Sequence, residues 1–177
     1  MSNGSLERKK HFVAELKTHF SESISAARLA EVNAGQLSES MRSEASGRGD
    51  AKAAVESGRM AVAHGERRER AKQDIDRLIG FSSKGLRVFR RDEPIGLGAM
   101  VDVRVEELES GKEEERTFFI LPVGAGTELE GPGGDGFLSV ITPESPVGRS
   151  LMGRRVGDSF DTETQGIERE WTVTDLV

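Results

Sequence analysis

Cysteine and tyrosine are both missing from this chain of 177 residues, and only 5 prolines are present. Without cysteine there is no disulfide, no thiolate ligand for a metal and no thiol nucleophile. No apolar run approaches the roughly 18 residues that would suggest a membrane-spanning helix. The charged residues near the N-terminus are not followed by an apolar segment, so we expect no signal peptide. These absences predict a cytoplasmic protein with no membrane contact.

Familiar catalytic and metal-binding motifs are missing as well. The sequence has neither a G-x-x-x-x-G-K-[ST] phosphate loop nor a G-x-S-x-G nucleophile elbow. The glycine-rich residues 131–136 contain no lysine, which favours a plain loop. His11 and His19 would lie two helical turns apart, too far to bind one ion, and His64 is isolated. We expect solvated histidines and no tightly bound cofactor.

Charge is unevenly distributed along the chain. Residues 1–80 carry 14 Lys/Arg against 12 Asp/Glu, whereas residues 81–177 carry 11 against 19. The acidic second half would be repelled by phosphates, which argues against general binding to duplex nucleic acid. Any contact with nucleic acid must therefore be local or act through another protein.

The first 80 residues have the pattern of two long helices. Residues 5–46 contain no proline, and apolar or small residues recur there every three or four positions. This heptad-like series comprises Val13, Leu16, Phe20, Ala27, Ala30, Ala34, Leu37 and Met41. Residues 50–79 also lack proline, and Gly80 follows them as a helix stop signal. Their apolar positions are Val55, Val62, Ile75, Leu78 and Ile79. Helices of about 60 and 45 Å would pair as an antiparallel coiled coil.

The joint between these helices is the predicted tip, residues 44–56. Gly47-Arg48-Gly49 is a short, permissive turn. Asp50 follows where the second helix needs an N-cap, and it is also a candidate functional carboxylate at the end of a long arm. Further along the second helix, a basic cluster predicts either a solvated face or a contact with RNA or an acidic protein groove. This cluster comprises Arg59, Arg67, Arg68, Arg70 and Lys72.

After residue 81 glycine and proline become frequent and apolar residues alternate, which predicts a sheet domain over 81–177. Strands are expected at residues 99–105, 116–123, 137–141, 158–163 and 168–176. Residues 106–115 read as a charged hairpin loop, 124–136 as a glycine-rich loop and 145–152 as a short helix. Trp171 is expected in the core. The fold class is therefore α+β, with a helical hairpin over 1–80 and then a small antiparallel sheet domain.

At this point the sequence resembles the bacterial Gre transcript-cleavage factors, GreA and GreB. Residues 141–158 look like the C-terminal signature of that family, in which a strand leads into Ser-Pro and ends at Gly-Asp. Its matching residues are Ser145, Pro146, Arg149, Leu151 and Gly153. Residues 164–171 continue like the family's final hairpin, and residues 44–52 are similar to its tip.

The resemblance implies a monomeric accessory factor of bacterial RNA polymerase, not an enzyme by itself. Its C-terminal domain, FKBP-like in fold, would dock at the secondary channel through the five signature residues just named. The helical hairpin would enter that channel and bring Glu44, Arg48, Asp50 and Lys52 to the polymerase active site. Nascent RNA would be met only through the polymerase, with Arg59, Arg67 and Arg68 as possible contacts.

The same resemblance implies how the tip would work. Asp50 and Glu56 would help to hold a Mg²⁺ that the polymerase supplies, so that water cleaves backtracked RNA. The chain departs from the family at one place, because Ala53 stands where the second tip carboxylate is expected. An alternative is therefore a non-cleaving or inhibitory Gre-like regulator. A more remote alternative is an FKBP-like prolyl isomerase.

Overall fold

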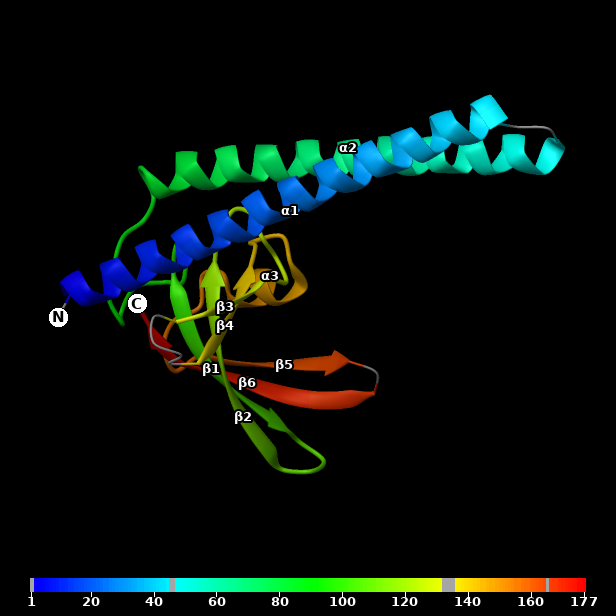
Figure 1. Ribbon diagram of the computed structural model, residues 1–177. Helices are drawn as coiled ribbons and strands as arrows, with labels where there is room; N and C mark the ends of the chain where they lie inside the picture. The colour runs from blue at the N-terminus through cyan, green and yellow to red at the C-terminus, as the bar shows by residue number, and fades with distance from the viewer. Residues whose placement is uncertain (1, 45–46, 132–135, 165) are drawn as a thin grey trace. The chain divides into compact units, whose positions relative to one another are not determined.

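The computed structural model of the chain describes residues 2–44, 47–131, 136–164 and 166–177. Two long helices, α1 (Ser2–Glu44) and α2 (Arg48–Ser82), come first (Figure 1). Strands β1 (Met100–Glu107), β2 (Lys112–Ile120), β3 (Glu128–Glu130) and β4 (Phe137–Ile141) follow. The short helix α3 (Pro146–Leu151) precedes β5 (Ser159–Thr164) and β6 (Ile167–Leu176). The predicted α+β class is confirmed, and no helix in these ranges is long and apolar enough to cross a membrane.

Several predicted boundaries were wrong. Helix α2 continues through Gly80 to Ser82. Most of the expected charged loop at 106–115 is strand, because backbone pairing holds both strands while their charged side chains face solvent. The loop predicted at 124–136 contains β3, which pairs with β4. β3 has only 3 residues, too few for an alternating pattern of apolar side chains to reveal it in the sequence.

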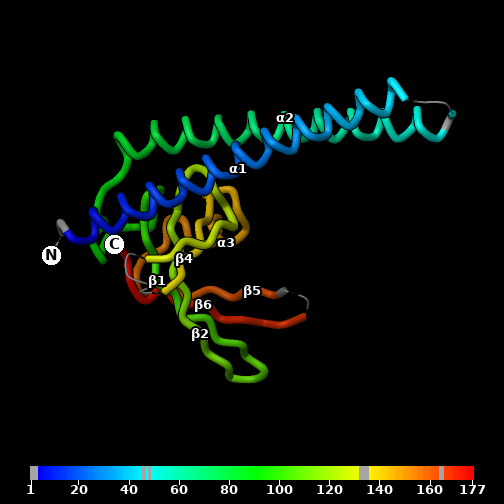
Figure 2. Tube along the Cα trace, in the orientation of Figure 1, coloured from blue at the N-terminus to red at the C-terminus, as the bar shows by residue number. Residues whose placement is uncertain are grey.

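The six strands form one mixed sheet in the order β3-β4-β2-β1-β6-β5. Four neighbouring pairs are antiparallel and β2 pairs with β4 in parallel, so the sheet is mostly antiparallel. Figure 2 traces the β1–β2 and β5–β6 hairpins that supply four of these strands. Burial alternates along the middle of β1, where Val101, Val103 and Val105 are buried and Asp102 and Arg104 are exposed.

One face of this sheet packs into the main core. Phe118 and Phe160 stack on either side of Trp171, with ring centroids 6.0 and 5.7 Å from the indole. Leu151 of α3 is fully buried in the same cluster. Trp171 is 7% exposed, so its predicted core position is confirmed. Side chains that fill a core in this way leave the sheet and α3 fixed against each other.

The opposite face of the sheet is covered by the beginning of α1. Phe12 lies edge-on to Phe119 at 6.4 Å between ring centroids. Leu16 is fully buried and packs on Gly124, where a Cβ would come within 3.0 Å of the leucine side chain. The chain accordingly divides into two compact units, Met1–Leu16 with Arg77–Val177, and Lys17–Asp76. The predicted domain boundary at residue 80 stays a prediction, but the sheet unit includes the start of α1.

A lysine anchors this helix start within the sheet unit. Lys9 is fully buried, and its ammonium donates to the main-chain oxygens of Arg87, Gly98 and Val177 at 2.7, 2.8 and 2.6 Å. Three N–H groups thus meet three acceptors. Burial, with the positive Arg87 nearby, lowers the pKa of Lys9 from 10.5 to about 8.

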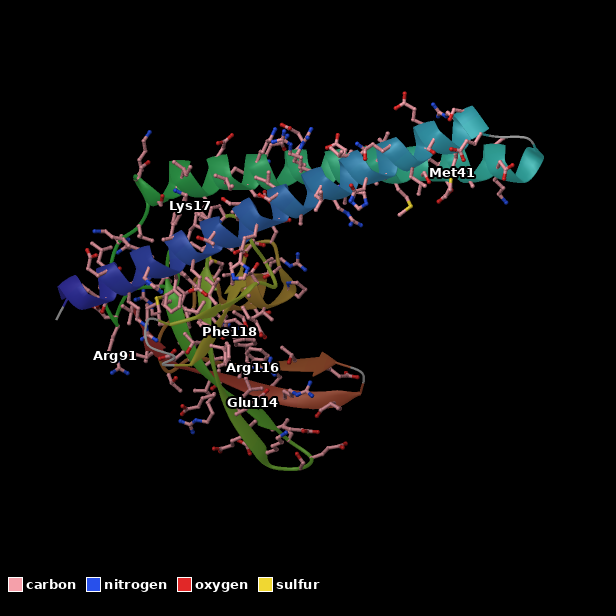
Figure 3. The ribbon with its side chains drawn as sticks, viewed as in Figure 1. Lys17, Met41, Arg91, Glu114, Arg116 and Phe118 are labelled. Carbon is pink, nitrogen blue, oxygen red and sulfur yellow. The ribbon has the colours of Figure 1, made fainter. Side chains whose placement is uncertain are left out.

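The sheet carries its charged side chains differently on its two faces. On one face, Glu107 is paired in register with Lys112 on β2 and with Arg169 on β6. On the other face, four carboxylates stand in register across β2, β1, β6 and β5. This acidic row consists of Glu113, Glu106, Glu170 and Asp161. Figure 3 labels Glu114, Arg116 and Phe118, which follow one another along β2 on the face opposite the row.

Candidate functional site

The candidate site at the tip lies where α1 ends and α2 begins. The peptide N–H of Ala51 donates to the carbonyl of Gly47 at 3.3 Å, so Gly47 is the N-cap of α2. The prediction that Asp50 is the N-cap was therefore wrong, because the helix starts two residues earlier, at Arg48. Asp50 is in the first turn instead, where a carboxylate is stabilised by the helix dipole.

The tip residues expected to act on a partner are exposed where the structure describes them. Glu44, Asp50, Lys52 and Glu56 all face solvent. The side chain of Arg48 lies outside the described residues, as do Ala45 and Ser46. Asp50 is therefore an exposed carboxylate in the first turn of α2, and its functional role stays a prediction.

The carboxylates on α2 are too far apart to bind one ion together. Asp50 and Glu56 are six residues apart in one continuous helix. Helix geometry then separates them by about 9 Å along the axis and about 120° around it. No group of three or more acidic or histidine side chains in the described ranges is arranged to hold a metal. A single carboxylate such as that of Asp50 supplies one oxygen ligand, and the other ligands of an ion would have to come from another molecule.

The two alanines that follow Asp50 have different environments. Ala54 is fully buried against α1, where its carbonyl accepts a hydrogen bond from the Ser38 hydroxyl at 2.7 Å. Ala53 is exposed. A side chain longer than alanine at position 53 would therefore point into solvent, one turn after Asp50. A longer side chain at position 54 would meet α1.

Small residues, not large apolar ones, join the two helices within the Lys17–Asp76 unit. As residue numbers rise along α1 they fall along α2, since Glu31 faces Gly65 and Ser38 faces Gly58. These contacts confirm the predicted antiparallel hairpin. The predicted apolar seam was wrong at Leu37, which is 49% exposed, whereas its neighbour Ser38 is buried. Close helix approach selects small side chains at the contact and leaves several larger ones outside.

The predicted RNA-contact arginines are not equivalent. Arg59 and Arg67 are exposed. Arg68 is half-buried, and its guanidinium lies 2.8 Å from a carboxylate oxygen of Glu31 on α1. This pair joins the two helices, so Arg68 already has a structural role. Contact with RNA stays a prediction for all three.

The signature around α3 is largely a structural device. The Ser145 hydroxyl accepts from the Gly148 N–H at 3.0 Å and donates to the Thr142 carbonyl at 2.7 Å, which caps α3. A Cβ on Gly148 would lie 1.9 Å from the Thr142 oxygen, so only glycine fits there. Pro146 stands at the first helical position, where its missing N–H costs nothing.

Only part of the signature is available to a partner. Leu151 is fully buried and cannot present its side chain, although sequence reasoning placed it among the docking residues. Gly153 adopts φ +81°, which places it in a turn. Pro146 and Arg149 are exposed, and Arg149 donates to the Glu144 carbonyl at 2.6 Å. We therefore expect any docking through this segment to use Pro146 and Arg149.

The second half of the chain matches a known protein family. Residues 92–176 match the family model "Transcription elongation factor, GreA/GreB, C-term". This part of the chain belongs to the GreA/GreB family. The match covers the whole sheet and α3, so the resemblance seen in residues 141–158 is confirmed.

Solved structures similar to the chain come from the same family. Gfh1, GreA factor homolog 1, of Thermus thermophilus is 22% identical over 91% of this chain and 94% of that chain, with a TM-score of 0.34. Gfh1 of Thermus aquaticus is 21% identical over 94% of each chain, with a TM-score of 0.33. A GreA/GreB factor from Nitrosomonas europaea is 19% identical over 58% of this chain and 78% of its own, with a TM-score of 0.32. No curated protein matches the chain.

Proposed function

We propose that this protein is a Gre-like transcription factor that binds bacterial RNA polymerase in the cytoplasm and modulates elongation through its hairpin tip. The observation that carries the proposal is a GreA/GreB C-terminal domain on the same chain as an antiparallel helical hairpin with an exposed Asp50 at its turn. The protein would be an accessory factor, which the match of residues 92–176 to GreA/GreB transcription elongation factors supports.

The proposed chemistry needs a second molecule to complete it. The polymerase would supply the Mg²⁺, which hard carboxylate oxygens suit. Asp50 would add one oxygen ligand and help to orient the water that cleaves backtracked RNA. Glu56, on another side of α2, would need a separate target.

A second candidate function is a regulator that occupies the polymerase without stimulating cleavage. The exposed alanine at position 53 favours it, because no carboxylate follows Asp50 on the next turn. A prolyl isomerase is less well supported, since Phe118 and Trp171 are buried in the core and do not line an open proline pocket.

Stalled, backtracked elongation complexes provide the test. We expect the wild-type protein to bind core polymerase and change the behaviour of these complexes. If it stimulates cleavage, Asp50→Ala abolishes the release of short 3′ fragments, and an unchanged rate refutes the role of Asp50. If it binds without cleavage, Ala53→Glu should create or increase fragment release. Absence of any polymerase binding by the wild-type protein would refute the proposed function itself.

A further inference from the structure

Two exposed valines lie in a hollow on one flank of the helical hairpin. Arg42 of α1 and Val55, Gly58, Arg59 and Val62 of α2 line it, and we call it the Val55–Val62 groove. Val55 is 49% exposed and Val62 is 64% exposed. The two are seven residues apart, so they stand two turns apart on nearly the same side of α2. Gly58 lies between them, and because it has no side chain the surface is hollow there.

The exposed valines are not explained by the hairpin itself. A β-branched side chain loses rotamer freedom in a helix, so valine is less favourable there than alanine by several tenths of a kcal/mol. The contact with α1 is made instead by small residues such as Ala54 and Ser57, which are buried. Exposed apolar side chains that follow one line on a surface commonly mark an interaction site.

The rim of the groove is positively charged. Arg42 reaches over the floor, with Nη2 3.7 Å from the position of a Cβ on Gly58. Among the residues that the structure describes, Arg42 has no ion-pair partner. The nearest contact of Arg59 is with Glu56 at 4.0 Å, and both side chains are largely exposed, so this pair is weak. Two guanidinium groups are thus available to an anionic partner.

We propose that the Val55–Val62 groove docks an acidic protein segment of the polymerase whose aliphatic side chains cover the two valines and whose carboxylates pair with Arg42 and Arg59. This inference rests on the proposed function. Protein is favoured over RNA because an unpaired nucleic-acid strand is bound by cations together with aromatic side chains, and the groove lines its floor with valine and glycine. An apolar floor with a basic rim is complementary to an acidic and aliphatic surface.

The test compares the affinity of full-length variants for core polymerase. Val62→Asp and Arg42→Glu are each expected to weaken binding by about tenfold or more, whereas Val62→Leu keeps the wild-type affinity. Leu29→Asp is the matched control, since Leu29 is 63% exposed and lies about 140° around α1 from Arg42. It adds the same charge away from the groove and should bind as the wild type does. Equal helical circular dichroism shows that each variant is folded.

The outcomes separate this inference from the proposed function. No binding by the wild-type protein removes the proposed function and the docking groove with it. Normal wild-type binding together with normal binding by Val62→Asp refutes the groove alone. Weak binding by Arg42→Glu and Arg59→Glu, with unchanged binding by the uncharged variants Val55→Thr and Val62→Thr, identifies a nucleic acid or another polyanion as the occupant and overturns the protein segment.

Discussion

Lys9 offers the sharpest test of how the sheet unit is held together. Replacing it with methionine keeps the length of the side chain and removes three hydrogen bonds to main-chain oxygens. Each buried acceptor left without a donor costs about 1–3 kcal/mol. Removing the buried charge recovers part of this loss. The drop in pKa from 10.5 to about 8 corresponds to roughly 3 kcal/mol.

The balance of these terms is a net loss of about 3 kcal/mol for Lys9→Met at neutral pH. Urea unfolding followed by fluorescence measures it, because Trp171 is the single tryptophan and lies in the core of the same unit. Lys10→Met is the matched control. Its side chain is exposed and forms an ion pair with Glu7 one turn away on the same helix, so it should change the free energy of unfolding by less than about 0.5 kcal/mol.

The pH dependence of the difference follows from the lowered pKa. Below about pH 8 the Lys9 amine is protonated in both the folded and the unfolded chain. Between about pH 8 and 10.5 the unfolded chain keeps the proton and the folded chain releases it, so wild-type stability rises with pH. Relative to Lys9→Met the gain approaches about 1.4 kcal/mol per pH unit. The absence of tyrosine and cysteine leaves few other groups to titrate there, and both proteins share them.

Two results would refute this reasoning about Lys9. A Lys9→Met variant as stable as the wild type would show that the three hydrogen bonds contribute nothing net. A stability difference that stays constant or shrinks from pH 8 to 10.5 would show that the ammonium is not desolvated in the folded protein.

The remaining predictions concern the sheet unit. In the acidic row, Glu106→Gln removes repulsion from two facing carboxylates and should stabilise the fold by about 0.5 kcal/mol at low salt, with little effect in 1 M salt. Glu107 faces two cations, so Glu107→Gln should destabilise the fold slightly. If thermal unfolding shows that both variants shift the stability in the same direction, the argument from strand register is wrong. Gly148→Ala should cost more than about 3 kcal/mol, because its Cβ would overlap the Thr142 oxygen. A Gly148→Ala variant as stable as the wild type would refute this packing argument. Gly80 lies in open space within α2, so Gly80→Ala should stabilise the fold by up to about 1 kcal/mol.

The helices and most strands were predictable from sequence because their signals are local. Absence of proline and recurrence of apolar residues at three and four positions predicted both helices, and alternation predicted β1. Which face of a helix is buried was harder to predict. Leu37 fits the heptad series better than Ser38 does, but the partner helix determines the contact, and it accepts a serine that bonds to the Ala54 carbonyl.

Lys9 shows why the rest could not be read from sequence. Lys9 falls on the same helical series as Val13 and Leu16, and that position indicates burial. A lysine at such a position nevertheless normally extends its ammonium to solvent. Its acceptors are 78, 89 and 168 residues away in the chain. Only the assembled sheet unit brings three free carbonyls to one place. The burial of Leu151 was equally hidden, since a sequence signature of a family does not distinguish docking residues from core residues.

Positions 53 and 54 at the tip are under different structural constraints. Position 54 must be small, because it is fully buried against Ser38. Position 53 has no such constraint, since Ala53 is exposed and glutamate is nearly as favourable as alanine in a helix. Folding therefore does not account for the missing carboxylate, and Ala53→Glu should leave hairpin stability almost unchanged. Any change in transcript cleavage by that variant can then be assigned to chemistry at the tip, because neither the hairpin nor the sheet unit has been perturbed.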